Sequence, residues 1–203
     1  MPLHGVMNTR TFILVTLVLL VVSCGSQAQD NPPPPVDDFV PGRWKEFVSD
    51  DGSFAVSMPG VPTEVSQPID NKAGSAVARF HNLITKTAEY SVGYTIFGRD
   101  LEKLQPTKVT LDGIRDRVLA KENGKLLSEE EISAEGHPGR ALTIEVGDGI
   151  FRDRYFLVGT RLYTMTVFTS TVKARSQAES DGIRKAQESV ANHFLDSFKL
   201  LTK

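Results

Sequence analysis

From Trp44 to Thr169, apolar and polar residues alternate in short runs, and turn-forming residues separate these runs at close intervals. A period of two is typical of strands that bury one face. Asp51-Gly52 separates the first two runs and Gly159-Thr160 separates the last two, at points where a tight reversal favours glycine. The pattern predicts antiparallel hairpins that continue as a meander.

The segments predicted as strands are residues 44–49, 53–58, 76–84, 90–97, 126–132, 140–146, 150–158 and 162–169. Pro59-Gly60-Val61-Pro62 is expected to end the second of them, because proline and glycine interrupt strands. In the fourth, every other residue is apolar, so one face of that strand is expected to be buried. The residues on that face are Tyr90, Val92, Tyr94 and Ile96.

Two further segments have the spacing of amphipathic helices. The first begins near Thr107 or Thr110, either of which is predicted as the N-cap, and stops at Asn123-Gly124. The second is predicted from about Gln177 to Ser197. Their apolar stripes are Leu111, Ile114, Val118 and Leu119, and Ile183, Ala186, Val190 and Phe194. Hairpins with helices between and after them predict an α+β fold, an antiparallel sheet with packed helices.

The chain has 203 residues, of which 40% are hydrophobic and 24% are charged, and its formal net charge is -2. This composition is typical of a globular protein with one domain. Because no excess of positive charge is present to attract phosphates, we expect no binding to nucleic acid.

The N-terminal residues 1–23 have the pattern of a signal peptide. Arg10 precedes the apolar run Phe12 to Val22, which is shorter than the roughly 20 apolar residues that a transmembrane helix needs. Val21-Val22-Ser23-Cys24-Gly25 then resembles the lipobox of bacterial lipoproteins, in which diacylglycerol is attached to the cysteine sulfur. Cys24, the single cysteine, is therefore the predicted lipidation site. The alternative is an ordinary cleavage site at Ser26-Gln27-Ala28 and a secreted, soluble protein.

Residues 24–42 are predicted to be a tether between the lipid and a single globular domain, residues 43–203. The tether contains Pro32-Pro33-Pro34-Pro35, which favours an extended polyproline II conformation. A PxxP ligand for a recognition domain is the alternative interpretation of the same prolines. The predicted location is outside the cytoplasm on a membrane, the outer membrane or cell surface where two membranes exist.

Strand and turn residues spread over the predicted domain carry a family resemblance. They are Trp44-Lys45-Glu46-Phe47, Phe54-Ala55-Val56-Ser57-Met58-Pro59-Gly60-Val61-Pro62, Leu126-Leu127-Ser128, His137-Pro138-Gly139-Arg140, the run from Arg154 to Tyr163, and Phe194-Leu195-Asp196-Ser197-Phe198. With these segments the chain resembles a family of exported bacterial lipoproteins related to the PsbP/Mog-type α/β/α sandwich. Relatives of that fold include extrinsic subunits of the photosynthetic oxygen-evolving complex and a binder of a small GTPase. The resemblance implies a fold and no particular activity, because its landmarks are strand and turn residues.

Residues that could carry chemistry are scattered. His81, His137 and His193 lie in separate segments, so we expect no metal site and no cofactor. Ser170-Thr171-Val172-Lys173 matches the SxxK motif of penicillin-recognising enzymes, but the accompanying SDN and KTG elements are missing. We therefore expect a protein that is not an enzyme. The alternatives are a hydrolase that uses scattered residues and a small-ligand carrier with a pocket between sheet and helix.

Two polar motifs are expected to serve the fold. Glu129-Glu130-Glu131 is predicted to be a solvated edge, since neighbours on a strand point to opposite faces. Glu135-Gly136-His137-Pro138-Gly139 is predicted to reverse the chain, and His137-Pro138-Gly139-Arg140 is predicted to be a type II turn, with Gly139 at the position of positive φ.

A candidate contact surface follows from the last hairpin. A two-residue turn at Gly159-Thr160 would place Arg152, Arg154, Phe156 and Tyr163 on one face, where guanidinium groups could lie near aromatic rings. We expect the domain to bind a protein or another envelope component, and these four residues are the candidate contact surface for an acidic partner. For the two arginines, a structural role in which their stems cover apolar neighbours is favoured over binding.

Overall fold

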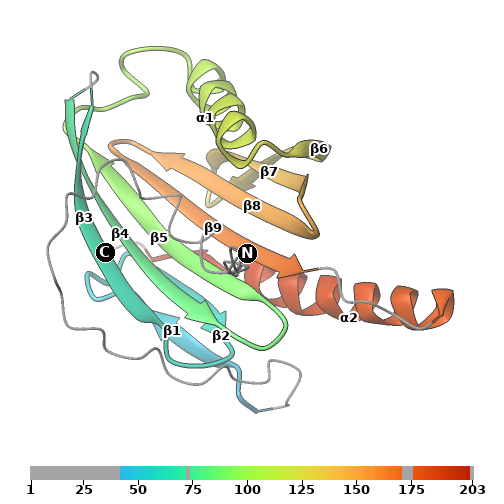
Figure 1. The fold of residues 1–203 in the computed structure, drawn as a ribbon. Coiled ribbons are helices and arrows are strands. Elements are labelled where there is room, and N and C mark those ends of the chain that lie inside the picture. Colours follow the sequence, from blue (N-terminus) through green and yellow to red (C-terminus); the bar gives the residue numbers. More distant parts are fainter. Residues whose placement is uncertain (1–41, 72–73, 171–175, 202–203) are drawn as a thin grey trace, which may run out of the picture. The chain divides into compact units, whose positions relative to one another are not determined.

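A seven-stranded antiparallel sheet dominates the computed structural model, which describes residues 42–71, 74–170 and 176–201 (Figure 1). The strand order is β3-β4-β5-β9-β8-β7-β6, so β3 and β6 are its edges. The bounds are β3 (Thr63–Asn71), β4 (Gly74–Ile84), β5 (Glu89–Phe97), β6 (Lys125–Ala134), β7 (His137–Val146), β8 (Gly149–Val158) and β9 (Arg161–Ser170). All described residues belong to the unit Pro35–Lys203.

A second, three-stranded sheet consists of β1 (Lys45–Val48), β2 (Phe54–Met58) and β10 (Lys199–Leu200), in the order β1-β2-β10. The predicted first hairpin is confirmed: β1 and β2 are antiparallel, and Gly52 in the turn has φ +64. β10 pairs with the other side of β2 and was not predicted, because two residues are too few to produce a period.

The two helices, α1 (Thr107–Glu122) and α2 (Gln177–Asp196), lie on opposite faces of the main sheet (Figure 1). Adjacent residues of β8 show this. Arg154 forms an ion pair with Asp196 at the end of α2, at 2.7 Å, whereas the Tyr155 hydroxyl donates to the carbonyl oxygen of Leu111 in α1, at 3.2 Å. Since consecutive residues of a strand point to opposite faces, each helix has its own face. The predicted α+β class is therefore confirmed. No helix in the described ranges is long and apolar enough to cross a membrane.

The helix ends match the predictions only in part. α2 has the side-chain oxygen of Ser176 as its N-cap, which accepts from the backbone N–H of Glu179. α1 stops at Asn123 in the left-handed conformation, φ 47, as predicted. Its predicted N-cap is wrong, because α1 begins after Pro106 without a side-chain cap, and Thr110 is buried inside its first turns.

Strand β3 is absent from the predictions because it has no buried period. It lies at an edge of the main sheet, and the side chains from Thr63 to Ser66 are exposed. Pro68, which cannot donate a backbone hydrogen bond, lies in the middle of this strand. From Thr63 to Ser66 the residues of both faces are exposed, which gives no alternation to detect.

The chain reverses within the predicted segment Glu135 to Gly139, but the predicted type II turn at His137-Pro138-Gly139-Arg140 is wrong. The reversal is at Glu135 and Gly136, both with positive φ, 48 and 82, and Ala134 pairs with His137. Gly139 lies inside β7 instead. A β carbon there would collide with the backbone oxygen of Tyr155 and the ring of Phe156, so the position requires glycine for close strand approach.

The main core lies on the α2 side of the large sheet, which α2 and the small sheet cover. Its buried members come from β2, β4, β5, β8, β9 and α2 and from Ala88, just before β5. They include three residues of the predicted buried face of β5, whereas the fourth, Ile96, is partly buried against this core. The buried members are Phe54, Val56, Met58, Leu83, Ala88, Tyr90, Val92, Tyr94, Phe156, Tyr163, Met165, Val167, Ala191, Phe194 and Leu195.

Candidate functional site

The predicted register of the β8–β9 hairpin is confirmed. Gly159, with φ +57, and Thr160 form the two-residue turn, and Val158 pairs with Arg161. The same register pairs Phe156 with Tyr163 and Arg154 with Met165. The four residues of the predicted contact surface therefore share one face of the sheet, the face on which α2 lies.

The aromatic half of that surface is buried. Phe156 and Tyr163 belong to the main core, and Phe198 stacks on Phe156 with ring centroids 5.8 Å apart. The small sheet and the segment after α2 cover these rings, so they are not open to a partner. One guanidinium on this face does lie over an aromatic ring, but it belongs to Arg161, 4.7 Å above Tyr94.

The two arginines have different surroundings. Arg154 binds Asp196 at 2.7 Å. Arg152 is half-buried and its guanidinium donates to the hydroxyl of Thr169 at 3.4 Å. Burial lowers the pKa of Arg152, and the charge of Glu188 on α2 opposes this shift. Within the described ranges, no carboxylate lies within 4 Å of Arg152.

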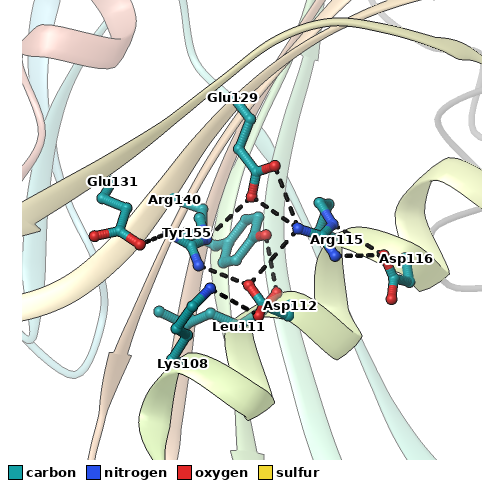
Figure 2. Close-up of polar contacts among 9 residues, drawn as sticks. All are labelled: Lys108, Leu111, Asp112, Arg115, Asp116, Glu129, Glu131, Arg140 and Tyr155. Carbon is teal, nitrogen blue, oxygen red and sulfur yellow. Dashed lines mark hydrogen bonds and ion pairs between the residues drawn. The ribbon is translucent and has the colours of Figure 1, made fainter.

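A dense group of charges joins α1 to the β6–β7 hairpin (Figure 2). We call it the Arg140 cluster. Its side chains are Lys108, Asp112, Arg115, Asp116, Glu129, Glu131 and Arg140.

Arg140 is the buried centre of this cluster, with a side chain only 4% exposed. Its guanidinium lies 2.6 Å from Asp112 of α1 and 2.6 Å from Glu131 of β6. Its Nε lies 3.1 Å from Oε1 of Glu129, which is close enough for an ion pair, but the N–H is not aligned for a hydrogen bond. One cation thus holds three carboxylates from two elements.

Further cations surround these carboxylates. Arg115 donates to both oxygens of Glu129, at 3.2 and 3.3 Å, and lies 2.8 Å from Asp116. Lys108 binds Asp112 at 2.9 Å. Each carboxylate of the cluster therefore has a cationic partner.

The electrostatic shifts follow from this pairing. Glu131 and then Asp112 raise the pKa of Arg140 above its ordinary value against the opposing effect of burial. Glu131 is 75% exposed, so water screens its pair, and the less exposed carboxylates of Asp112 and Glu129 are the stronger partners. Hydrogen bonds from Lys108 and Arg140 lower the pKa of Asp112.

The expectation of a solvated edge at Glu129-Glu130-Glu131 needs correction. Glu129 and Glu131 point to the same face and both bind Arg140, and only Glu130 points to the other face. The signal was present in the sequence, because a hairpin through Glu135-Gly136 places Glu131 directly opposite Arg140.

A row of polar side chains crosses the α1 side of the main sheet on four neighbouring strands. In register order these are Asn82 of β4, Ser91 of β5, Thr166 of β9 and Asp153 of β8. The Ser91 hydroxyl donates to Asn82 Oδ1 at 2.7 Å, and the Thr166 hydroxyl donates to Asp153 Oδ1 at 2.7 Å.

Asp153 is 2% exposed, and burial raises the pKa of its carboxyl to about 7. The hydrogen bond from Thr166 opposes the shift, and the charge of Glu122 at the end of α1 adds to it. A single acid among Phe151, Tyr155 and Leu157 on one strand face is the sequence signal that the predictions missed.

Glu89 is a second carboxyl of this kind on the same face, opposite Phe168. Burial raises its pKa to about 7, and its buried Oε2 has no hydrogen-bond partner among the described residues. Perturbed carboxyls of this type occur at functional sites, and also in purely structural positions.

The histidines do not converge. His81 is buried against Phe47, with ring centroids 4.6 Å apart, and burial lowers its pKa. Nε2 of His193 lies 3.4 Å from the hydroxyl of Ser57, and the His193 ring forms a T-shaped contact with Trp44, with ring centroids 4.5 Å apart. No group of three His, Cys, Asp or Glu side chains in the described part of the chain could hold a metal ion. Cys24 and most of the SxxK motif, Ser170 to Lys173, lie outside the described residues.

Neither a protein-family model nor a curated protein matches the sequence. Among solved structures, the chain is similar to cyanobacterial PsbP (CyanoP) from Synechocystis sp. PCC 6803, with a TM-score of 0.47, 14% identity, and coverage of 84% of this chain and 100% of that chain. It is also similar to PA94 from Pseudomonas aeruginosa, with a TM-score of 0.37, 13% identity, and coverage of 80% and 99%. A protein from Bacteroides thetaiotaomicron matches at a TM-score of 0.33 and 13% identity, over 79% of this chain and 50% of that chain. Likenesses at this distance concern the fold and assign no activity.

Proposed function

We propose that this chain is an exported lipoprotein whose α+β domain is held at a membrane by a lipid on Cys24 and binds a protein or another envelope component. The observation that carries the proposal is the position of Cys24, one residue after the end of the apolar run Phe12 to Val22 and before a proline-rich segment. Two or more acyl chains on that residue anchor a domain stably, whereas one chain binds marginally.

The length of the proposed tether suits this arrangement. Residues 24–42 would span roughly 60 Å if extended at about 3.1 Å per residue. Such a spacer lets a folded domain reach partners that stand clear of the lipid surface. Binding is favoured over acid–base catalysis at the Arg140 cluster, because the carboxylates there are engaged by cations.

A carrier or hydrolase is the second candidate function. The buried carboxyls of Asp153 and Glu89 favour it, since both have a pKa near 7 and both face the α1 side of the sheet. A small ligand with hydrogen-bond donors would satisfy Oε2 of Glu89.

Replacement of the cysteine tests the anchor. In Cys24→Ala we expect loss of labelling with a palmitate analogue and release of the domain from the membrane fraction, with an unchanged melting temperature. Ser26→Ala is the matched control and keeps both labelling and membrane association. The proposal is wrong if the Cys24→Ala chain still takes up the palmitate analogue. It is also wrong if mass spectrometry of the mature protein without substitutions finds that its N-terminus follows Ala28. Crosslinking in envelopes followed by capture, with Cys24→Ala as reference, then identifies partners.

A further inference from the structure

The half of the main sheet formed by β6, β7 and β8 is covered unequally on its two faces. On one face, α1 and the Arg140 cluster cover it. The opposite face, on the α2 side, carries rows of side chains that are half-buried or exposed, and two of these rows end in an arginine. These two rows are Ser128, Thr143 and Arg152, and Glu130, Ala141 and Arg154. We call these six positions the open face. The next row on the same face, Lys125, Glu145 and Ile150, borders it and brings one base and one acid.

The open face is built for contact at its centre. Its middle positions, Ala141 and Thr143, are small and half-buried, so an approaching chain meets no long side chain there. Its inner border is formed by the two arginines, beyond which Val167 and Met165 belong to the core. Its outer border is the edge strand β6, where Ser128 and Glu130 are exposed.

The two arginines indicate what the surface binds. Arg154 shows the preferred partner, because it binds the carboxylate of Asp196 at 2.7 Å. Arg152 occupies the equivalent place in the neighbouring row, and no described carboxylate lies within 4 Å of it. A guanidinium has five N–H donors in a planar fork, and its hydrogen bond to Thr169 at 3.4 Å is long. For a half-buried guanidinium with one long hydrogen bond, the most stabilising ligand is a carboxylate that accepts two hydrogen bonds from it.

We propose that the open face binds an acidic segment of a partner protein, with one carboxylate of that segment on Arg152. This inference rests on the proposed binding function and specifies its surface and the chemistry of its partner. The hydroxyl of Thr143, opposite Arg152 in register, is placed to donate to the same carboxylate. Glu130 at the outer border repels a second acid, so the segment carries a neutral or basic residue there.

The test uses the Cys24→Ala chain, so that membrane anchoring does not enter the measurement. The probe is a synthetic ten-residue threonine peptide with one glutamate near its centre, and its reference is the same peptide with glutamine in place of that glutamate. We expect the glutamate peptide to bind at least tenfold more tightly by fluorescence anisotropy. Its addition should also shift the side-chain Nε–Hε NMR signal of Arg152.

Variants then assign the effect. Arg152→Gln should abolish the tenfold preference, and Arg152→Lys, which keeps the charge but loses the fork, should retain part of it. Arg117→Gln, an exposed arginine of α1, is the matched control and should bind like the unmodified chain. Melting temperatures show that each variant is folded, and if Arg152→Gln does not fold, Arg152→Lys and the NMR shift decide.

Three results would overturn the proposal. One is equal binding of the two peptides, and another is an unchanged preference in folded Arg152→Gln. The third is binding that depends on Arg152 but is seen only with phosphatidylglycerol vesicles, not with phosphatidylcholine vesicles or the peptide, which would make the ligand a lipid. None of these outcomes bears on the lipidation of Cys24, so the two proposals fail separately.

Discussion

Arg140 and Asp153 lie on neighbouring strands, on the same face of the main sheet, and they are buried to the same degree, 3% and 2% exposed. Their surroundings are opposite. Three carboxylates lie within 3.1 Å of the Arg140 guanidinium. Asp153 instead has the neutral hydroxyl of Thr166 at 2.7 Å.

The difference shows two ways in which one fold can bury an ionisable group. Arg140 keeps its charge, because carboxylates replace the water that burial removes. Asp153 has no counter-ion of this kind in the described part of the chain, so burial raises its pKa to about 7 and the carboxyl is mostly neutral below that pH. The charge of Arg140 thus depends on neighbouring carboxylates, whereas the charge of Asp153 depends on pH.

Removing the charge of Arg140 is expected to have the largest effect. In Arg140→Met, the carboxylates of Asp112, Glu129 and Glu131 remain close together without their shared cation. Breaking a buried ion pair by removing one partner costs about 3–5 kcal/mol of unfolding free energy. Urea unfolding followed by circular dichroism measures this loss.

Arg117→Met is the control for Arg140→Met. Arg117 is an exposed arginine of α1, the helix that packs on the β6–β7 hairpin. It should change the unfolding free energy little. Equal losses in the two variants would mean that the Arg140 cluster does not hold α1 on the sheet.

Asp153→Asn is expected to remove a pH dependence of stability. The pKa of this carboxyl is 3.8 in the unfolded chain and about 7 in the folded chain. The folded state therefore binds more protons between these values, and stability falls as the pH rises through that window. From pH 5 to pH 8 the loss is about 3 kcal/mol, at 1.36 kcal/mol per pH unit up to the folded pKa.

Melting temperatures of both chains from pH 5 to pH 8 test this. Glu89 and His81 also have shifted pKa values, so the relevant quantity is the difference between the curves of the unmodified chain and Asp153→Asn. Asp148→Asn, an exposed acid in the β7–β8 turn, is the control and should leave the curve unchanged. If Asp153→Asn keeps the full slope, the carboxyl is ionised in the folded protein and the contrast with Arg140 is wrong.

Lys108→Ala is expected to have the smallest effect. Its ion pair with Asp112, at 2.9 Å, joins an exposed lysine to a carboxylate that Arg140 already binds. Exposed pairs contribute little because water and salt screen them, so the melting temperature should fall by no more than about 1 °C. Differential scanning fluorimetry resolves a larger change, which would show that the rim of the cluster matters as much as its centre.

The sequence predicted the features that depend on local chemistry. The β8–β9 register followed from a glycine at the first turn position, and the buried face of β5 followed from the alternation at Tyr90, Val92 and Tyr94. Both are properties of a few neighbouring residues, which period and turn geometry describe well.

The sequence did not predict features that depend on distant neighbours. The burial of Phe156 and Tyr163 requires Phe198, which approaches them only after α2 has crossed the sheet. The role of Arg140 was hidden because the turn was placed at Pro138-Gly139, three residues beyond its true position. One error in a turn changes the partner of every residue in a hairpin.

The position of β2 has a consequence for how the chain reaches its folded state. β2 is the central strand of the small sheet, and its neighbours β1 and β10 are separated by most of the described chain. The backbone N–H of Ser57 donates to the hydroxyl of Ser197 across 140 positions of sequence, at 2.8 Å. When a chain is synthesised or exported with its N-terminus first, the small sheet cannot form completely until β10 is available. A chain that crosses a membrane unfolded therefore leaves one side of β2 unpaired until β10 has crossed.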